Sequence, residues 1–135
     1  MEIGIVRKSG LFSLNAISVA IIASGLSSGT AMAAGDAAQG AKLYAQCRAC
    51  HTVNRGGANT LGPNLAGIVG AKAGLKQGFK YSPALVKSNI VWTPQKLDAW
   101  LMRPAAVVPG NKMAFAGIAN PQARASIIAY LAQQK

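Results

Sequence analysis

The residues of this chain best suited to chemistry form one short motif, Cys47-Arg48-Ala49-Cys50-His51. The motif contains both cysteines and the single histidine of the 135-residue chain. C-x-x-C-H is the pattern of c-type haem attachment. Two cysteines three positions apart on a helical turn can form thioether bonds to two vinyl groups on one porphyrin edge. The adjacent histidine then lies under the iron and can ligate it through Nε2. The motif therefore predicts one covalently attached haem c.

Other uses of the motif fit the rest of the sequence less well. A disulfide-exchange pair usually follows a strand of an α/β fold and needs no histidine. A structural zinc site needs a further Cys or His, and the chain has neither. A single disulfide would leave His51 without a role. The only acidic residues are Glu2, Asp36 and Asp98, too few for a catalytic centre built from carboxylates. We therefore expect any chemistry to come from a cofactor.

The second axial position of the iron has three candidate ligands, Met102, Met113 and Lys112. A second histidine does not exist, and two of the four methionines lie in the first 33 residues. Met102 ends a predicted helix, whereas Met113 follows the bend-prone sequence 109–112. Elimination favours Met113, with a deprotonated Lys112 as the alternative. His/Met ligation raises the reduction potential, and a filled sixth site keeps peroxide and small ligands off the metal. This ligation favours electron transfer over oxygen chemistry.

The first 33 residues have the organisation of a secretory signal peptide. Two basic residues precede an uncharged stretch at 11–26, and small residues follow up to an A-x-A sequence at 31–33. The stretch is shorter than the ~20 apolar residues of a membrane span. We expect cleavage after Ala33, export to the periplasm and one mature domain at residues 34–135. An uncleaved membrane anchor is the alternative.

The mature chain reads as short helices joined by Gly-rich loops. Asp36 can cap a first helix that runs through Cys47. The next three helices each begin with a capping residue followed by proline, at Ser82-Pro83, Thr93-Pro94 and Asn120-Pro121.

The second of these three helices is expected to stop at about Met102, before Pro104, and to bury one stripe of apolar residues. The loops at 56–67 and 107–112 are expected to be tight, with no packing of their own. No stretch alternates apolar and polar residues over a strand's length, so the fold class is all-α. The stripe consists of Leu97, Trp100 and Leu101.

The mature chain resembles the class I cytochromes c, in the mitochondrial-like branch that includes bacterial periplasmic monohaem cytochromes c. The resemblance runs from Gly35 to Lys135 and keeps several widely spaced motifs in the family's order. It implies the class I fold, in which short helices and loops surround one covalently bound haem, and an electron carrier rather than an enzyme. The motifs are Gly40 and Tyr44, C-x-x-C-H with Thr52-Val53, Gly62-Pro63-Asn64-Leu65, Gly78-Phe79-Lys80-Tyr81, Trp92, residues 109–118 and residues 128–131.

The resemblance also implies a role for individual residues around the haem. The Pro63 carbonyl should accept a hydrogen bond from Nδ1–H of the axial histidine and so orient its ring. Tyr81 and Trp92 should hydrogen-bond a buried propionate. Asn111 should support the methionine side of the haem, and Phe115 should shield the haem edge.

Two further positions should mark the crossing of the first and last helices, and three depart from the family pattern. Gly40 and Tyr130 should meet at the crossing, where a small residue lets the ring pack. Ala71 stands where the family commonly has Arg, Trp100 where it commonly has Tyr, and Leu85 where it commonly has a polar residue. The resemblance places these three positions around the haem, where side chains tune the redox potential.

Charge indicates the kind of partner. The chain has 14 Lys and Arg against three acidic residues, a formal net charge of +11. Cations around the haem edge would steer the protein to redox proteins with acidic docking surfaces. Nucleic acid is not an expected partner, because the predicted leader exports the protein and no aromatic–basic array is visible. The expected ring consists of Lys42, Arg48, Lys80, Lys96, Arg103 and Lys112.

Together these features predict a monomeric, periplasmic one-electron carrier. It would shuttle electrons between respiratory or dehydrogenase donors and a terminal acceptor, and contact the membrane only through its partners. One alternative is a haem enzyme or gas sensor with an accessible sixth site. Another is the same carrier held at the membrane by an uncleaved leader.

Overall fold

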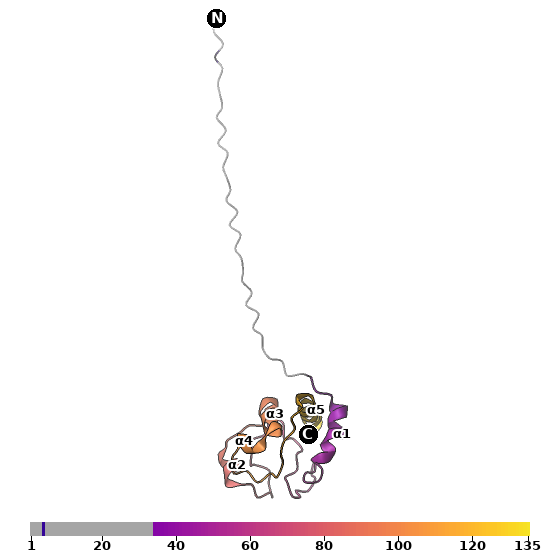
Figure 1. Ribbon diagram of the computed structural model, residues 1–135, viewed down its shortest axis with the longest axis vertical. Helices are drawn as coiled ribbons and strands as arrows, with labels where there is room; N and C mark the ends of the chain where they lie inside the picture. Colours follow the sequence, from indigo (N-terminus) through magenta and orange to yellow (C-terminus); the bar gives the residue numbers. More distant parts are fainter. Residues whose placement is uncertain (1–3, 5–33) are drawn as a thin grey trace. The chain divides into compact units, whose positions relative to one another are not determined.

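The computed structural model describes Gly4 and residues 34–135 (Figure 1). The predicted leader, apart from Gly4, lies outside the described residues. Within 34–135 there is no β-strand, only an isolated antiparallel bridge between Lys72 and Val91, so the all-α prediction is confirmed. No helix of this part of the chain has the length and apolar character needed to cross a membrane. The elements are α1 (Ala37–Leu43), the 3-10 helix η1 (Tyr44–Gln46), α2 (Pro83–Lys87), α3 (Pro94–Met102), α4 (Pro104–Val107) and α5 (Pro121–Gln133).

Four helices begin at the residues that the sequence predicts. The Asp36 carboxylate accepts hydrogen bonds from the first turn of α1, at 2.8 and 3.2 Å. Ser82, Thr93 and Asn120 each accept a hydrogen bond from the backbone N–H three residues later, at 3.0–3.2 Å. Each bond satisfies an N–H group that has no partner within its helix. The capping predictions for α1, α2, α3 and α5 are confirmed.

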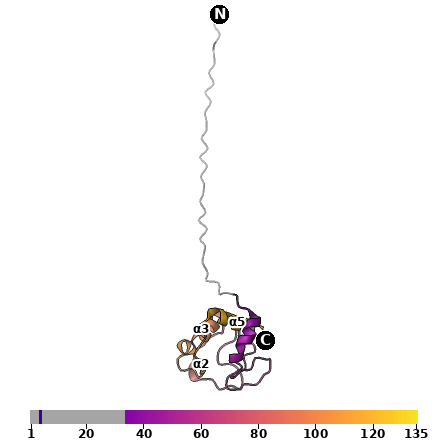
Figure 2. The ribbon, with the colours of Figure 1, turned by 45° about the vertical axis from the view of Figure 1, so that its right-hand side comes forward.

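Helices α1 and α5 lie side by side and cross at a glycine (Figures 1 and 2). A methyl group on Gly40 would overlap the backbone carbonyl of Ser126 and approach Cβ of Tyr130. Beside this contact the rings of Tyr44 and Tyr130 pack with their centroids 5.3 Å apart. The predicted crossing at Gly40 and Tyr130 is confirmed.

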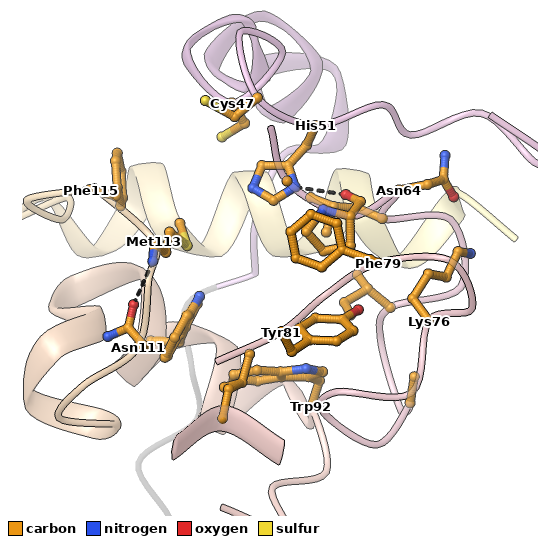
Figure 3. Close-up of a pocket in the computed structure, with 18 of the residues that line it drawn as sticks. Cys47, His51, Asn64, Lys76, Phe79, Tyr81, Trp92, Asn111, Met113 and Phe115 are labelled. Carbon is orange, nitrogen blue, oxygen red and sulfur yellow. Dashed lines mark hydrogen bonds between the residues drawn. The ribbon is translucent and has the colours of Figure 1, made fainter. Parts of the chain in front are cut away.

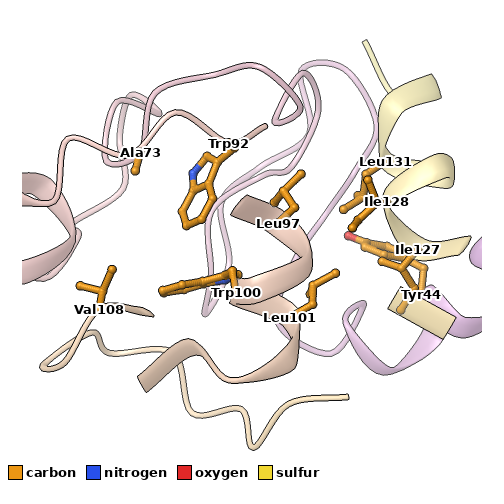
Figure 4. Packing of buried hydrophobic residues seen from close by; sticks show 10 residues of the cluster. All are labelled: Tyr44, Ala73, Trp92, Leu97, Trp100, Leu101, Val108, Ile127, Ile128 and Leu131. Atoms are coloured by element: carbon orange, nitrogen blue, oxygen red, sulfur yellow. The ribbon is translucent and has the colours of Figure 1, made fainter. Parts of the chain in front are cut away.

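The core lies on both sides of α3 (Figure 4). The predicted stripe of Leu97, Trp100 and Leu101 is buried. On one side Trp100 packs against Trp92, with ring centroids 5.1 Å apart. On the other side the stripe faces apolar residues of η1 and α5. Those residues are Tyr44, Ile127, Ile128 and Leu131.

Two helix boundaries differ from the prediction. The first α-helix ends at Leu43 and the chain continues as the 3-10 turn η1, instead of remaining α-helical through Cys47. Pro104 stops α3, as predicted, but it also begins the one-turn helix α4. Arg103 between them is extended, with φ −161°. A proline is compatible with the first turn of a helix because the N–H it lacks has no partner there.

The prediction that two loops have no packing of their own is wrong. In loop 56–67 the side chain of Asn64 is only 2% exposed and is hydrogen-bonded to its surroundings. In 107–112 the side chain of Val108 belongs to the core. The glycine and proline residues correctly predict where the chain turns, but they do not predict which neighbouring side chains are buried.

Candidate haem site

A cavity of about 840 Å³ lies inside the domain. It is lined by the Cys-x-x-Cys-His segment, the stretch 61–68, the stretch 71–82, α3, residues 111–115 and α5. Protein interiors are close-packed, with few voids larger than a water molecule. A cavity of this size in a small domain fits a large prosthetic group. The cysteine and histidine donors in its wall are those expected for haem c.

The Cys-x-x-Cys-His segment forms a tight turn that exposes its donors to the cavity. The carbonyl of Cys47 accepts hydrogen bonds from the N–H of Cys50 at 3.0 Å and of His51 at 2.9 Å. Both cysteines are free and partly buried, and both line the cavity. Burial, and secondarily the charge of Cys50, raises the pKa of the Cys47 thiol. Because both cysteines belong to one turn of the cavity wall, two thioether bonds can form there on one edge of a haem.

Tyr44 holds the end of this turn in place through a hydrogen bond to its backbone. Its hydroxyl donates a hydrogen bond to the backbone carbonyl of His51 at 3.0 Å. Burial is the main cause that raises the pKa of Tyr44 to about 12, with smaller contributions from Cys47 and Tyr130. The hydroxyl therefore stays protonated and remains a donor throughout the neutral range.

The His51 ring is oriented by Pro63. Nδ1 lies 2.7 Å from the Pro63 carbonyl oxygen, which can only accept, so Nδ1 carries the proton. Nε2 then keeps its lone pair for a metal. In Figure 3 this second ring nitrogen points away from Pro63, toward the side of the cavity where Met113 lies. Gly62 leaves room for the ring, since a methyl group there would overlap its atoms.

The sequence reasoning gave no role to Asn64, which holds the backbone next to Pro63. Its side-chain nitrogen donates to Oγ1 of Thr52 at 2.7 Å and to the carbonyl of Asn54 at 2.9 Å. Its side-chain oxygen accepts from the N–H of Ala66 at 3.0 Å, and its own N–H donates to Oδ1 of Asn59 at 2.9 Å. The sequence signal for this network is weak: an asparagine directly after Gly62-Pro63, where its amide can bond the neighbouring backbone.

Met113 reaches the cavity from a separate loop. The Asn111 side chain accepts a hydrogen bond from the Met113 N–H and donates one to the Val108 carbonyl, both at 2.9 Å. Lys112 and Phe115 also line the cavity. Met102, by contrast, is 51% exposed and is not among the lining residues. Of the two methionines in residues 34–135, only Met113 lines the cavity and can present its sulfur there.

Tyr81 and Trp92 lie together at another wall of the cavity (Figure 3). Burial raises the pKa of Tyr81, while a backbone hydrogen bond at Lys76 lowers it by less, so Tyr81 stays a donor at neutral pH. The ring of Phe79, which sequence reasoning left without a role, packs edge-on against Tyr81 at 4.9 Å. The backbone N–H of Trp92 donates to the Ala71 carbonyl at 2.8 Å, which holds the backbone at Trp92, and the indole packs against Trp100.

The three departures from the family pattern all line the cavity: Ala71, Leu85 and Trp100. Of the six cations predicted around the haem edge, two line the cavity wall. Lys80 and Lys112 line the cavity, whereas the other four predicted members do not, and sequence reasoning missed two cations that do. The missed cations are Lys72 and Lys76.

Comparison with known proteins identifies the family. The family model described as cytochrome c matches residues 37–135. Cytochrome c2 from Rhodomicrobium vannielii is 43% identical over 122 residues, which cover 90% of this chain and 98% of that protein. The chain belongs to the cytochrome c family. A second relative of this cytochrome, cytochrome c2 from Agrobacterium tumefaciens, is 44% identical over 100 residues, 72% of this chain and 90% of that protein.

A solved structure supports the same assignment. Cytochrome cH from Methylobacterium extorquens is 47% identical to this cytochrome, with a TM-score of 0.69 over 73% of this chain and 98% of that chain. The class I cytochrome c fold is therefore confirmed. So are one haem c, covalently bound through Cys47 and Cys50, and a role in electron transfer rather than enzymatic catalysis.

Proposed function

We propose that this cytochrome is a periplasmic one-electron carrier whose iron is ligated by Nε2 of His51 and Sδ of Met113. The observation that supports the ligand pair best is the 2.7 Å contact of His51 Nδ1 with the Pro63 carbonyl, which frees Nε2. Met113 lies on the side of the cavity toward which Nε2 points (Figure 3). A soft thioether prefers ferrous iron, so this pair raises the reduction potential.

Different residues around the cavity would then hold the haem and exclude water from it. When bound, the haem supplies one reversible electron between ferric and ferrous iron. Tyr81 and the indole of Trp92 would donate hydrogen bonds to a propionate. Asn111 would hold the backbone of Met113, and Phe115 would cover the haem edge on that side. With His51 and Met113 both bound to the haem, peroxide and small ligands would be kept from the metal.

Charge supports a partner with an acidic docking surface. Four cations line the cavity: Lys72, Lys76, Lys80 and Lys112. Of the two acidic residues in 34–135, Asp98 is paired with a buried arginine. The unbalanced positive charge would speed encounter with an acidic surface on a membrane reductase, dehydrogenase or oxidase. We infer a monomeric carrier that reaches the membrane through these partners.

The leader assignment belongs to the same proposal. Residues 1–33 have the order of a signal peptide, and removal after Ala33 would leave Ala34 as the N-terminus of the periplasmic protein. N-terminal sequencing of the periplasmic fraction checks this assignment. Recovery of only the uncleaved chain, in membranes, would contradict it.

The ligand assignment is tested by two methionine variants. Met113→Ala should lower the reduction potential and let carbon monoxide bind the reduced protein readily, because the sixth position becomes accessible. Met102→Ala is the matched control, since it removes the same side chain outside the cavity, and it should leave both properties unchanged. Rapid carbon monoxide binding by the unmodified protein would contradict the proposal.

A further inference from the structure

We propose that Arg124 is a positioning residue for the Met113 ligand, acting as a clamp on the end of the loop that carries it. This inference rests on the proposed His/Met ligation. The Met113 loop is defined here as residues 109–120, between α4 and α5. Arg124 lies on the first turns of α5 and is buried.

The guanidinium of Arg124 joins three segments of the chain. Nη1 donates to the carbonyls of Ile118 and Ala119, both at 2.8 Å, at the end of the Met113 loop. Nε and Nη2 donate to the two carboxylate oxygens of Asp98 on α3, at 2.7 and 3.3 Å. A planar guanidinium suits this arrangement because its donors form a rigid fork. A lysine at this position would keep the charge but could not reproduce the fork.

The same end of the loop lies directly on α3. The Ile118 N–H donates to the Leu101 carbonyl at 2.8 Å. Gly117 has φ 108°, and a methyl group there would overlap the carbonyl of Met102. The end of the loop is therefore fixed to α3 by its backbone and to α3 and α5 by Arg124.

The Met113 side chain packs against the core, but the backbone in the middle of the loop makes no hydrogen bond to another element of the described structure. In the described structure the Met113 N–H donates to Asn111 and the Phe115 N–H donates to the Met113 carbonyl at 3.0 Å, so both bonds stay inside the loop. Besides this packing, the position of the Met113 backbone depends on the two ends of the loop, Asn111 at the start and the clamp at the end. Segments with few long-range contacts open locally at a lower free energy than the whole protein.

The hydrogen bonds of Arg124 fit a role in positioning the Met113 loop better than a role in stabilising the whole fold. A buried ion pair contributes little net stability, because the loss of hydration offsets the attraction between the charges. Two of the four hydrogen bonds of Arg124 go to backbone carbonyls of the Met113 loop rather than to its ion-pair partner. The clamp therefore restricts these two carbonyls, and the backbone that leads back to Met113, to a single conformation.

Cyanide binding to the oxidised holoprotein measures how often the loop opens. Arg124→Lys should bind cyanide about tenfold faster than the unmodified protein, the size expected for losing hydrogen bonds from a charged donor. Asp98→Asn, which keeps the shape of the partner, should change the rate in the same direction and serves if Arg124→Lys does not fold. Ile128→Ala is the control, since it truncates a buried residue of the same helix that does not line the cavity.

The control separates loop opening from general instability. We expect Ile128→Ala to lower the free energy of unfolding but to leave the cyanide rate near that of the unmodified protein. Equal cyanide rates in the unmodified, Arg124→Lys and Asp98→Asn proteins would overturn the clamp. The clamp would also be overturned if the cyanide-binding rate rose in proportion to the loss of unfolding free energy in every variant, including Ile128→Ala. An unmodified oxidised protein without the sulfur-to-iron charge-transfer band would overturn the ligation proposal, and the clamp with it.

Discussion

Replacing Asn64 by alanine should destabilise this cytochrome more than its place in a glycine-rich loop suggests. The side chain makes three hydrogen bonds, two donated by its nitrogen and one accepted by its oxygen. It is 2% exposed, so water cannot replace those partners without opening the loop. The network holds the chain on either side of the Pro63 carbonyl, which orients His51.

The magnitude follows from these bonds. Each intramolecular hydrogen bond contributes about 0.5–1.5 kcal/mol net, and a partner left unsatisfied costs about 1–3 kcal/mol. Thr52 keeps a second hydrogen bond, to the Ala58 carbonyl at 2.6 Å, whereas the Ala66 N–H loses its partner. We therefore expect Asn64→Ala to lower the free energy of unfolding by about 2–4 kcal/mol.

Urea unfolding of the oxidised holoprotein measures this loss. With a slope of about 1–3 kcal/mol per M, the midpoint should fall by about 1 M or more. Asn54→Ala is the matched control, because Asn54 is exposed and joins the network through its backbone carbonyl alone. It should change stability by less than about 0.5 kcal/mol. A midpoint for Asn64→Ala equal to that of Asn54→Ala would refute the reasoning.

Three further predictions concern the other parts of the site. Burial raises the pKa of Tyr44 in the folded protein from the ordinary 10 to about 12. The protonated hydroxyl therefore contributes its full stability below pH 10, and this contribution is lost as the pH rises toward 12. In Tyr44→Phe, the free energy of unfolding measured against pH should lack this decline between pH 10 and 12. Cys50→Ser removes one thioether anchor and should reduce or abolish covalently retained haem, seen by haem staining on a denaturing gel. Electron transfer to an acidic partner should slow as salt rises, because exposed charges are screened over about 8 Å at physiological ionic strength; stopped-flow rates that do not change with salt would contradict the docking model.

The helix starts were predictable because their cause is local. At Ser82, Thr93 and Asn120 the cap and the following proline act within three residues of the chain. The effect of Pro104 was predicted only in part. Proline can both stop one helix and start the next, and the sequence around Pro104 does not indicate that the short helix α4 follows.

The site was predictable where its residues form a motif and not where they meet through the fold. Cys47, Cys50 and His51 are adjacent in sequence, so their shared chemistry is visible there. The ion pair of Arg124 with Asp98 spans 26 residues, and the hydrogen bond from Asn59 to the Gln77 carbonyl spans 18. The cations Lys72 and Lys76 were missed for the same reason, because nothing near them in sequence shows that they line the cavity.

The ligand pair is the central claim, and the visible spectrum of the oxidised protein tests it most directly. The unmodified protein and Met102→Ala should both show the sulfur-to-iron charge-transfer band, because Met102 lies half-exposed outside the cavity. Met113→Ala should lose the band. A band that persists in Met113→Ala and disappears in Met102→Ala would contradict the account.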